Sequence, residues 1–209
     1  MDRALERRMT GDRYVPRFSR TERAVHWVHA SAFFALLGSG LVLYLPSLAA
    51  AIGRRPLVKD VHLLTALAWV LALVAVLALG DRRRLRATAR ELDVFDSDDR
   101  RWLLGRPAPQ GRFNAGQKLN AALTAAFAVL LTVSGVLLWL GERDTRLRFD
   151  STIVLHDVVA YLSVALLAGH LYLAVIHPTT RHALRGITVG TVREDWAREH
   201  HRKWPVDAE

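Results

Sequence analysis

The chain of 209 residues is 51% hydrophobic, yet it carries 29 Lys and Arg against 20 Asp and Glu, a formal net charge of +9. It has no cysteine, which excludes disulfides, covalent c-type haem attachment and iron–sulfur clusters held by thiolates. The basic residues flank apolar segments and no nucleic-acid motif accompanies them, so they predict membrane orientation and lipid-headgroup contacts, and no nucleic-acid binding.

Four apolar segments are long enough to cross a hydrocarbon core of about 30 Å, which takes roughly 20 helical residues. The first is too long for the apolar part of a signal peptide, and no convincing small-residue cleavage site follows it, so we expect it in the mature protein. We therefore expect an all-α membrane protein, a four-transmembrane-helix bundle in a single domain (1–209), with helices at about 24–45, 61–79, 119–140 and 152–176.

Lys and Arg are distributed unevenly among the segments outside these helices. Residues 1–23, 80–118 and 177–209 hold 7, 10 and 6 of them, whereas 46–60 and 141–151 hold 3 each. The positive-inside rule then predicts a multi-pass protein with both termini and the long middle loop cytoplasmic. We expect one short helix in the middle loop. The cytoplasmic tail is expected to be either a surface-lying helix or an ordered segment packed on a partner. No internal repeat of fixed period is visible.

Five histidines lie within the apolar segments, where ionisable residues are costly and indicate function. His156 and His170 are 14 residues apart, close to four helical turns, so they face the same side about 21 Å apart along the axis. Depth in the membrane pairs His170 with His26 or His29, and His156 with His62. Two imidazoles at one level suit the axial ligation of a haem. Hydrogen-bonded packing or proton relay is the alternative, and spacing alone does not select between His26 and His29.

Each level offers too few ligands for a closed zinc site. Small residues support a bundle in which backbones or a macrocycle approach closely, namely Gly38, Ser39, Gly40, Ser134, Gly135 and Gly169. Of the remaining histidines, His177 is expected at the membrane interface, and three are expected in solvent: His182, His200 and His201.

Four segments of the chain carry a family resemblance. RFSRTERAVHW (17–27), RFNAGQKLN (112–120), LHDVVAYLSVALLAGHLYLAVIHP (155–178) and DWAREHHRKW (195–204) resemble the cytochrome b (gamma) subunit of membrane-bound respiratory formate dehydrogenase. The resemblance covers nearly the whole chain, and the NAGQK loop and WAxxHHxxW tail are its most specific parts. One departure is VHLLTALAW (61–69), which lacks the Pro and Gly that follow this histidine in the family.

The resemblance implies two b haems and assigns their ligands. It places His26 and His170 on the iron of the cytoplasmic-side haem, and His62 and His156 on the iron of the outer-side haem. It also implies that menaquinone or ubiquinone binds beside the cytoplasmic-side haem.

The resemblance places that quinone on Asn114, Gly116 and Gln117, with His170 close enough to contribute. An Asn side chain and a turn permitted by Gly can supply hydrogen bonds to quinone carbonyls. Taken alone, the same residues would only cap the third helix through Asn114.

The resemblance also implies the location, the bacterial inner (cytoplasmic) membrane, and the partners. Electrons would come from an iron–sulfur (beta) subunit, while formate would be oxidised in a molybdopterin catalytic (alpha) subunit, so this chain would be a non-catalytic electron-transfer subunit. A nickel–iron hydrogenase, or another molybdopterin oxidoreductase, is the alternative partner for the same haem arrangement. A different class of function is a haem-free membrane anchor or a proton-relay transporter.

Overall fold

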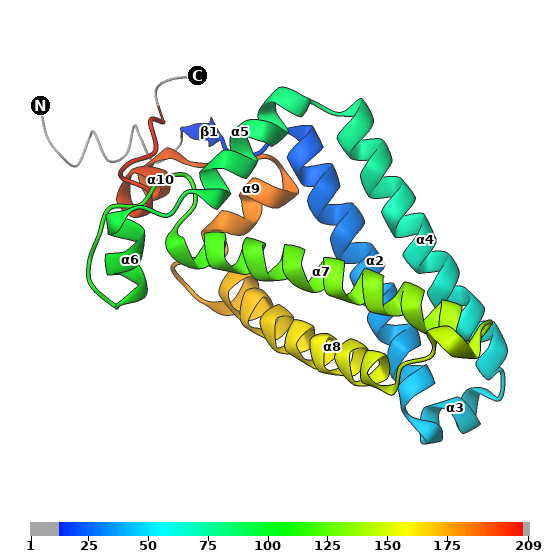
Figure 1. Ribbon diagram of the computed structural model, residues 1–209. Helices are drawn as coiled ribbons and strands as arrows, with labels where there is room; N and C mark the ends of the chain where they lie inside the picture. The colour runs from blue at the N-terminus through cyan, green and yellow to red at the C-terminus, as the bar shows by residue number, and fades with distance from the viewer. Residues whose placement is uncertain (1–12, 207–209) are drawn as a thin grey trace, which may run out of the picture. The chain divides into compact units, whose positions relative to one another are not determined.

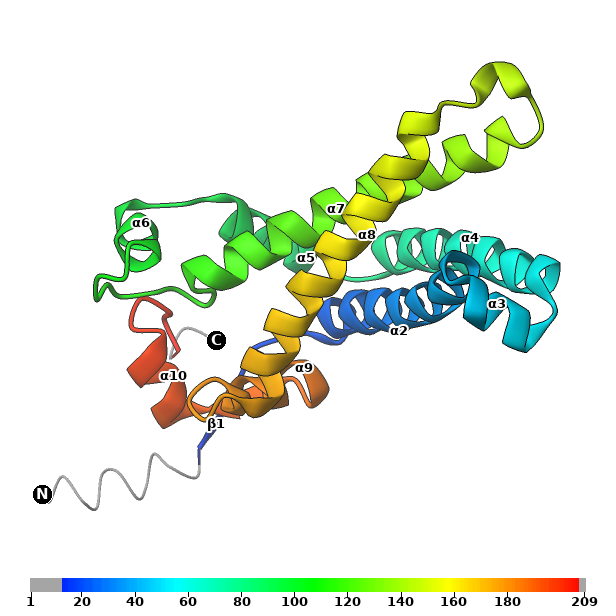
Figure 2. The same cartoon turned by 90° about the horizontal axis from the view of Figure 1, so that it is seen from below.

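The computed structural model describes residues 13–206, which form two compact units. One unit runs from Ser19 to Arg86, and the other combines the residues before Ser19 with those from Ala87 onward. Residues 1–12 and 207–209, which belong to the predicted cytoplasmic ends, lie outside the described residues. Each unit is built on one antiparallel pair of long helices (Figures 1 and 2).

The first unit is a helical hairpin with a short helix at its turn. Its first long helix begins at a capping box, in which Ser19 Oγ accepts from the Glu22 amide and the Glu22 carboxylate accepts from the Ser19 amide. The short helix begins at a proline and ends at Gly53, whose φ of 66° favours glycine. The helices of this unit are α2 (Arg20–Tyr44), α3 (Pro46–Ile52) and α4 (Arg55–Leu79), and α5 (Arg82–Asp93) begins here and ends in the other unit.

The second unit contains the other long hairpin. Its first helix also starts at a capping box, between Asn114 and Gln117. Its second helix ends in a π-helical turn, in which the His177 amide donates to the Tyr172 carbonyl. In chain order the hairpin consists of α7 (Ala115–Gly141), η1 (Thr145–Leu147), α8 (Asp150–Leu171) and η2 (Tyr172–Ile176).

The rest of the second unit is a polar head, which we define as residues 13–18, 87–114 and 177–206. Two short antiparallel strands pair Val15 with Val192, and both side chains are buried against Trp196 and Ala197. Beside the end of α5, the elements of the head are β1 (Tyr14–Pro16), α6 (Ser97–Leu103), η3 (Arg181–Ala183), α9 (Leu184–Thr188), β2 (Thr191–Arg193) and α10 (Glu194–His200).

Two expectations about the polar segments were wrong. The middle loop holds two helices, α5 and α6, where one was expected. The tail is not a surface-lying helix, because Trp196 and Ala197 of α10 are buried against the N-terminal strand of the same chain. The tail is ordered, as the second alternative proposed, but it packs on residues of its own chain.

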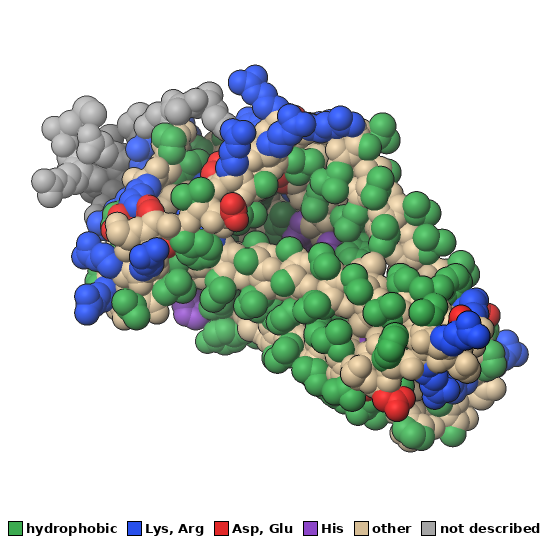
Figure 3. Space-filling view, viewed as in Figure 1, with side chains coloured by type: hydrophobic (Ala, Val, Ile, Leu, Met, Phe, Trp, Pro, Cys, Tyr) green, Lys and Arg blue, Asp and Glu red, His purple; other side chains and the backbone are tan. Residues whose placement is uncertain are grey.

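Four helices of the described residues are long and apolar enough to cross a membrane: Arg20–Tyr44, Arg55–Leu79, Ala115–Gly141 and Asp150–Ile176. This confirms a long apolar helix at each of the four predicted positions, with the second starting six residues earlier than expected. Large apolar side chains on these helices are exposed, as far as 65% for Leu64 and 87% for Leu79. On the face drawn in Figure 3, hydrophobic side chains cover the long helices, and Lys and Arg gather beyond their ends. Such surfaces suit lipid on several sides.

Candidate functional site: histidines, a capped loop and a buried arginine

His62 on α4 is held by a serine of α2 within the first unit. Its Nδ1 lies 2.8 Å from Ser39 Oγ, and the same hydroxyl lies 2.8 Å from the Ala35 carbonyl one turn earlier. A hydroxyl has a single proton, which it gives to that carbonyl, so the proton in the contact with the imidazole belongs to Nδ1. This leaves Nε2 of His62 unprotonated, with its lone pair pointing away from the serine.

His156 on α8 has the same environment within the second unit. Its Nδ1 lies 2.9 Å from Ser134 Oγ on α7, and that hydroxyl lies 2.6 Å from the Leu130 carbonyl. The same reasoning assigns the proton to Nδ1 and an unprotonated Nε2. Histidines that bind metal through one nitrogen commonly donate from the other, because this holds the ring orientation and raises its basicity. Both imidazoles therefore have the chemistry of an axial haem ligand.

A glycine follows each serine and lies beside the same imidazole, at ordinary van der Waals distance. A Cβ at Gly40 would lie 3.5 Å from His62 Cε1, and one at Gly135 would lie 3.6 Å from His156 Cε1. These small residues were expected to allow close approach, and the group beside them is the imidazole of the neighbouring helix. The hydrogen bonds of the serines were not predicted, although the similar segments SGLVLYL (39–45) and SGVLLWL (134–140) carry the signal.

The two histidines near the start of α2 have different surroundings. His29 lies among aromatic rings, 5.5 Å from Trp69 and 6.3 Å from Phe33 between ring centroids. His26 contacts Trp27 edge-to-face, at 5.3 Å. His29 thus packs against α4 within its own hairpin, and the choice of His26 over His29 as a ligand stays a prediction.

His170 lies one residue before the end of α8, directly ahead of the π-helical turn η2. Turns of this kind are frequent at functional sites, because they redirect the side chains next to them. Pro178 follows and stops the helix. No cluster of three or more His, Cys, Asp or Glu suited to a metal ion occurs within residues 13–206. His26 and His62 belong to one unit and His156 and His170 to the other, so the pairing of ligands stays a prediction.

The NAGQ loop forms the N-terminus of α7, and its amide groups are oriented by helix capping. Asn114 Oδ1 accepts from the Gln117 amide at 2.9 Å, and Gln117 Oε1 accepts from the Asn114 amide at 3.1 Å. This confirms the expected N-cap. Because both side-chain oxygens accept, the NH₂ groups are what these residues offer a ligand, and NH₂ donors match the carbonyl oxygens of a quinone. Gly116 has a steric role, since a Cβ there would lie 3.1 Å from the ring of Trp102.

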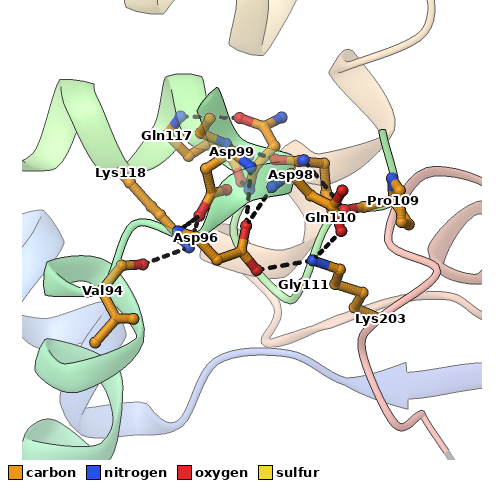
Figure 4. A network of polar contacts seen from close by, with 12 residues as sticks. Val94, Asp96, Asp98, Asp99, Pro109, Gln110, Gly111, Gln117, Lys118 and Lys203 are labelled. Atoms are coloured by element: carbon orange, nitrogen blue, oxygen red, sulfur yellow. Dashed lines mark hydrogen bonds and ion pairs between the residues drawn. The ribbon is translucent and has the colours of Figure 1, made fainter. Parts of the chain in front are cut away.

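A network of polar contacts in the polar head fixes this loop (Figure 4). Gln110 Oε1 accepts from the Ala115 amide at 2.8 Å, which satisfies a further N-terminal donor of α7. Lys118 Nζ donates to Asp99 at 2.6 Å and to the Val94 carbonyl at 2.8 Å. Lys203 of the tail bridges two other carboxylates of the α6 segment, those of Asp96 and Asp98.

Arg17 joins the three segments of the polar head. Its Nη2 donates to the Arg112 carbonyl at 2.9 Å and contacts Gln117 Oε1 at 3.3 Å, while Arg112 donates back to the Arg17 carbonyl. Its guanidinium lies over the rings of Trp196 and Phe18, at 5.2 and 5.3 Å. Burial and the nearby Arg112 charge lower the pKa of Arg17 to about 9. The side chain thus stays charged at neutral pH and ties the tail to the loop.

His201 was predicted to lie in solvent, and this was wrong, because it is only 2% exposed. Its Nδ1 donates to the Gly111 carbonyl at 2.6 Å, and its Nε2 faces Arg17 Nη2 at 3.4 Å. Burial first, and then the Arg17 charge, lower the pKa of His201 to about 4. The imidazole is therefore neutral and accepts from the arginine. The prediction for His182 was right, because that residue is exposed.

Apolar helices of spanning length, two of which carry a histidine whose Nδ1 contacts a serine hydroxyl, are typical of helical membrane cytochromes. The chain belongs to the prokaryotic cytochrome b561 family, whose model matches residues 17–190. A cytochrome of the b type contains haem b, so membership implies haem b binding, and the donor set described above fits that group.

The chain is also similar to the cytochrome subunits of several formate dehydrogenases. It is 23% identical to the formate dehydrogenase cytochrome b556 subunit of Haemophilus influenzae, over 94% of this chain and 84% of that one. It is 21% identical to the cytochrome b556(Fdn) subunit of the nitrate-inducible formate dehydrogenase of Escherichia coli K12, over 94% and 92%. It is 26% identical to the cytochrome b556(fdo) subunit of the same strain, over 91% of each chain. These similarities confirm the resemblance stated from the sequence.

Proposed function

We propose that this chain is the membrane subunit of a formate dehydrogenase, carrying electrons from an iron–sulfur partner through two b haems to a quinone. The observation that carries the proposal is similarity to formate dehydrogenase cytochrome b556 subunits over more than nine-tenths of the chain. A molybdopterin subunit would oxidise formate, and this chain would carry out the quinone step.

The four histidines hold the irons in this proposal. His62 and His156 are the axial ligands of the outer-side haem, supported by their matching bonds from Nδ1 to a serine. His26 and His170 are the ligands of the cytoplasmic-side haem, which rests on depth along the helices and on the family pattern. When bound, the haems supply one-electron carriers at two depths of the membrane.

The NAGQ loop is the quinone site in this proposal. Asn114 and Gln117 present NH₂ donors to the quinone carbonyls, and Gly116 leaves room for the Trp102 ring that packs behind the loop. The hydrogen bonds of Gln110 and Lys118 hold the donors in place, so little ordering is needed when the quinone binds.

The charge distribution supports the direction of transfer. With both termini and the polar head in the cytoplasm of a bacterial cell, quinone bound at the NAGQ loop takes its two protons from that side. Electrons that enter from the outer side then cross the membrane toward those protons. Charge is separated without any helix that pumps protons.

Haem content tests the ligand scheme. The pyridine haemochrome of the purified membrane complex, normalised to this chain, should show two b haems in the wild type and about one in His62→Ala and in His170→Ala. His182→Ala removes an exposed histidine that the scheme does not use, and it should keep both. A haem content indifferent to the first two substitutions would sink the assignment and favour a haem-free anchor or a proton-relay transporter.

The electron donor is tested separately. Formate added to membranes that contain the assembled complex should reduce the b haems, as seen in the α-band of the difference spectrum, and added quinone should reoxidise them. Reduction by hydrogen gas and not by formate would assign the chain to a nickel–iron hydrogenase. The haem-ligand assignments would survive that result, because they do not depend on the donor.

A further inference from the structure

One structural arrangement occurs twice in this chain, once in each unit. A serine–glycine pair in the first helix of a hairpin faces a histidine of the second helix, 23 residues after Ser39 and 22 after Ser134. The Nδ1–Oγ distances are 2.8 and 2.9 Å, and both hydroxyls donate to the carbonyl four residues earlier. The helices are alike around these points, with SGLVLYL in α2 and SGVLLWL in α7.

We propose that Ser39 and Ser134 are a matched pair of positioning residues for the two axial ligands of a single iron, that of the outer-side haem. This inference rests on the proposed function and adds to it the groups that set each ligand's tautomer and ring orientation. Each serine presents an oxygen lone pair to Nδ1–H, so Nε2 of His62 and of His156 is the nitrogen directed at the metal.

The arrangement is more specific than helix packing requires. Ser31 on α2 and Ser163 on α8 also donate to the carbonyl four residues earlier. Their hydroxyls bond to carbonyls of their own helices and not to an imidazole of the described residues. A serine that merely joins two helices has no need of an imidazole partner, yet here both partners are histidines and both contact the serine through Nδ1. In both hairpins a glycine follows the serine and lies beside Cε1 of the same imidazole.

The hydrogen bond also has an electronic consequence. Donation from Nδ1–H raises the basicity of Nε2, and a more basic ligand stabilises the oxidised iron. Loss of one serine bond should therefore favour reduction of that haem. We expect the ratio of reduced to oxidised haem at a fixed potential to rise severalfold and up to about tenfold, and tenfold corresponds to 59 mV for a one-electron couple.

The experiment is a redox titration of the b haems in the intact complex, with EPR of the oxidised state. The variants are Ser39→Ala, Ser134→Ala and the double variant. Ser39→Thr restores a hydroxyl, and Ser31→Ala and Ser163→Ala are matched controls without an imidazole partner. We expect both test variants to shift the potential and low-spin EPR signal of the same haem, the one lost in His62→Ala. The double variant should shift it further, Ser39→Thr should return it toward wild type, and the controls should leave it unchanged.

Each outcome decides the proposal. Unchanged signals in both alanine variants, or shifts in two different haems, would overturn it while the haem-ligand scheme stands. Loss of the outer-side haem from Ser39→Ala supports it if Ser39→Thr restores the haem, and counts against it if threonine does not. Failure of the proposed function is seen in a different measurement, the haem content of the complex, which His62→Ala would then leave unchanged.

Discussion

Acidification should loosen the polar head, because His201 is buried in its neutral form. Its pKa is lowered from 6.5 to about 4, first by burial and then by the Arg17 charge. When the head opens, the exposed imidazole takes up a proton at any pH below 6.5, whereas the closed head does not until about pH 4. The stabilisation is thus fully present above pH 6.5 and is lost as the pH falls toward 4. Between these two pKa values, the free energy of opening the head falls by about 1.36 kcal/mol for each unit by which the pH is lowered.

With these two pKa values, the free energy of opening should fall by about 1.8 kcal/mol between pH 7 and pH 5, which is about 20-fold in the opening equilibrium. Hydrogen exchange with mass spectrometry measures it on amides that hold the head together. Examples are the His201 amide, bonded to the Ala197 carbonyl, and the Glu194 amide, bonded to the Arg13 carbonyl. Rates are corrected for the intrinsic effect of pH on exchange.

His201→Asn removes the titrating group and should flatten this pH dependence. His182→Gln changes an exposed histidine of the polar head and serves as the matched control that keeps the wild-type slope. Equal protection of the wild type at pH 7 and pH 5 would refute the reasoning. A loss of protection between pH 7 and pH 5 that is as large in His201→Asn as in the wild type would also refute it, because the effect would then come from other groups.

Two further substitutions test the packing around the NAGQ loop and Arg17, both read as thermal unfolding midpoints of the complex in detergent. Lys118→Met should lower the free energy of unfolding by about 3–5 kcal/mol, because it leaves the Asp99 carboxylate, which is 4% exposed, buried without its partner. Adding Asp99→Asn should recover most of this loss. No recovery would contradict the ion-pair explanation. Gly186→Val should lower the free energy of unfolding by about 1–3 kcal/mol, because even a Cβ at this position would lie 3.2 Å from Arg17 Cδ. Gly111→Ala, where a Cβ meets no described atom within 4 Å, should be neutral, and an equal loss in both glycine variants would contradict the steric argument.

The spans were predictable because the requirement for them is local. A helix in lipid satisfies its own backbone, so about 20 consecutive apolar residues are a sufficient signal, and the structure has a helix of spanning length at each of the four positions. The Asn114 cap was also predictable, since a capping box lies within four residues of sequence. The start of α4 was not, because Arg55, Lys59 and Asp60 continue a helix beyond its apolar part.

The polar head was the least predictable region. Arg17, Gly111 and His201 are far apart in sequence, and a histidine followed by Arg and Lys resembles a solvated tail. The burial of His201 depends on contacts with Gly111 and Arg17, which lie 90 and 184 positions earlier in the chain. Composition reports the average polarity of a segment, and it does not report which side chain of that segment turns inward.

The sequence by itself determined the membrane class, the four spans, the candidate histidines and the family resemblance, because each depends on hydropathy, spacing or short motifs along one segment. Only the tertiary structure decided that Ser39 bonds His62, that Ser134 bonds His156, and that His201 is neutral and buried beside Arg17. The physical reason is that a proton's position and a pKa depend on the groups that surround an atom in space, and these come from segments distant in the chain.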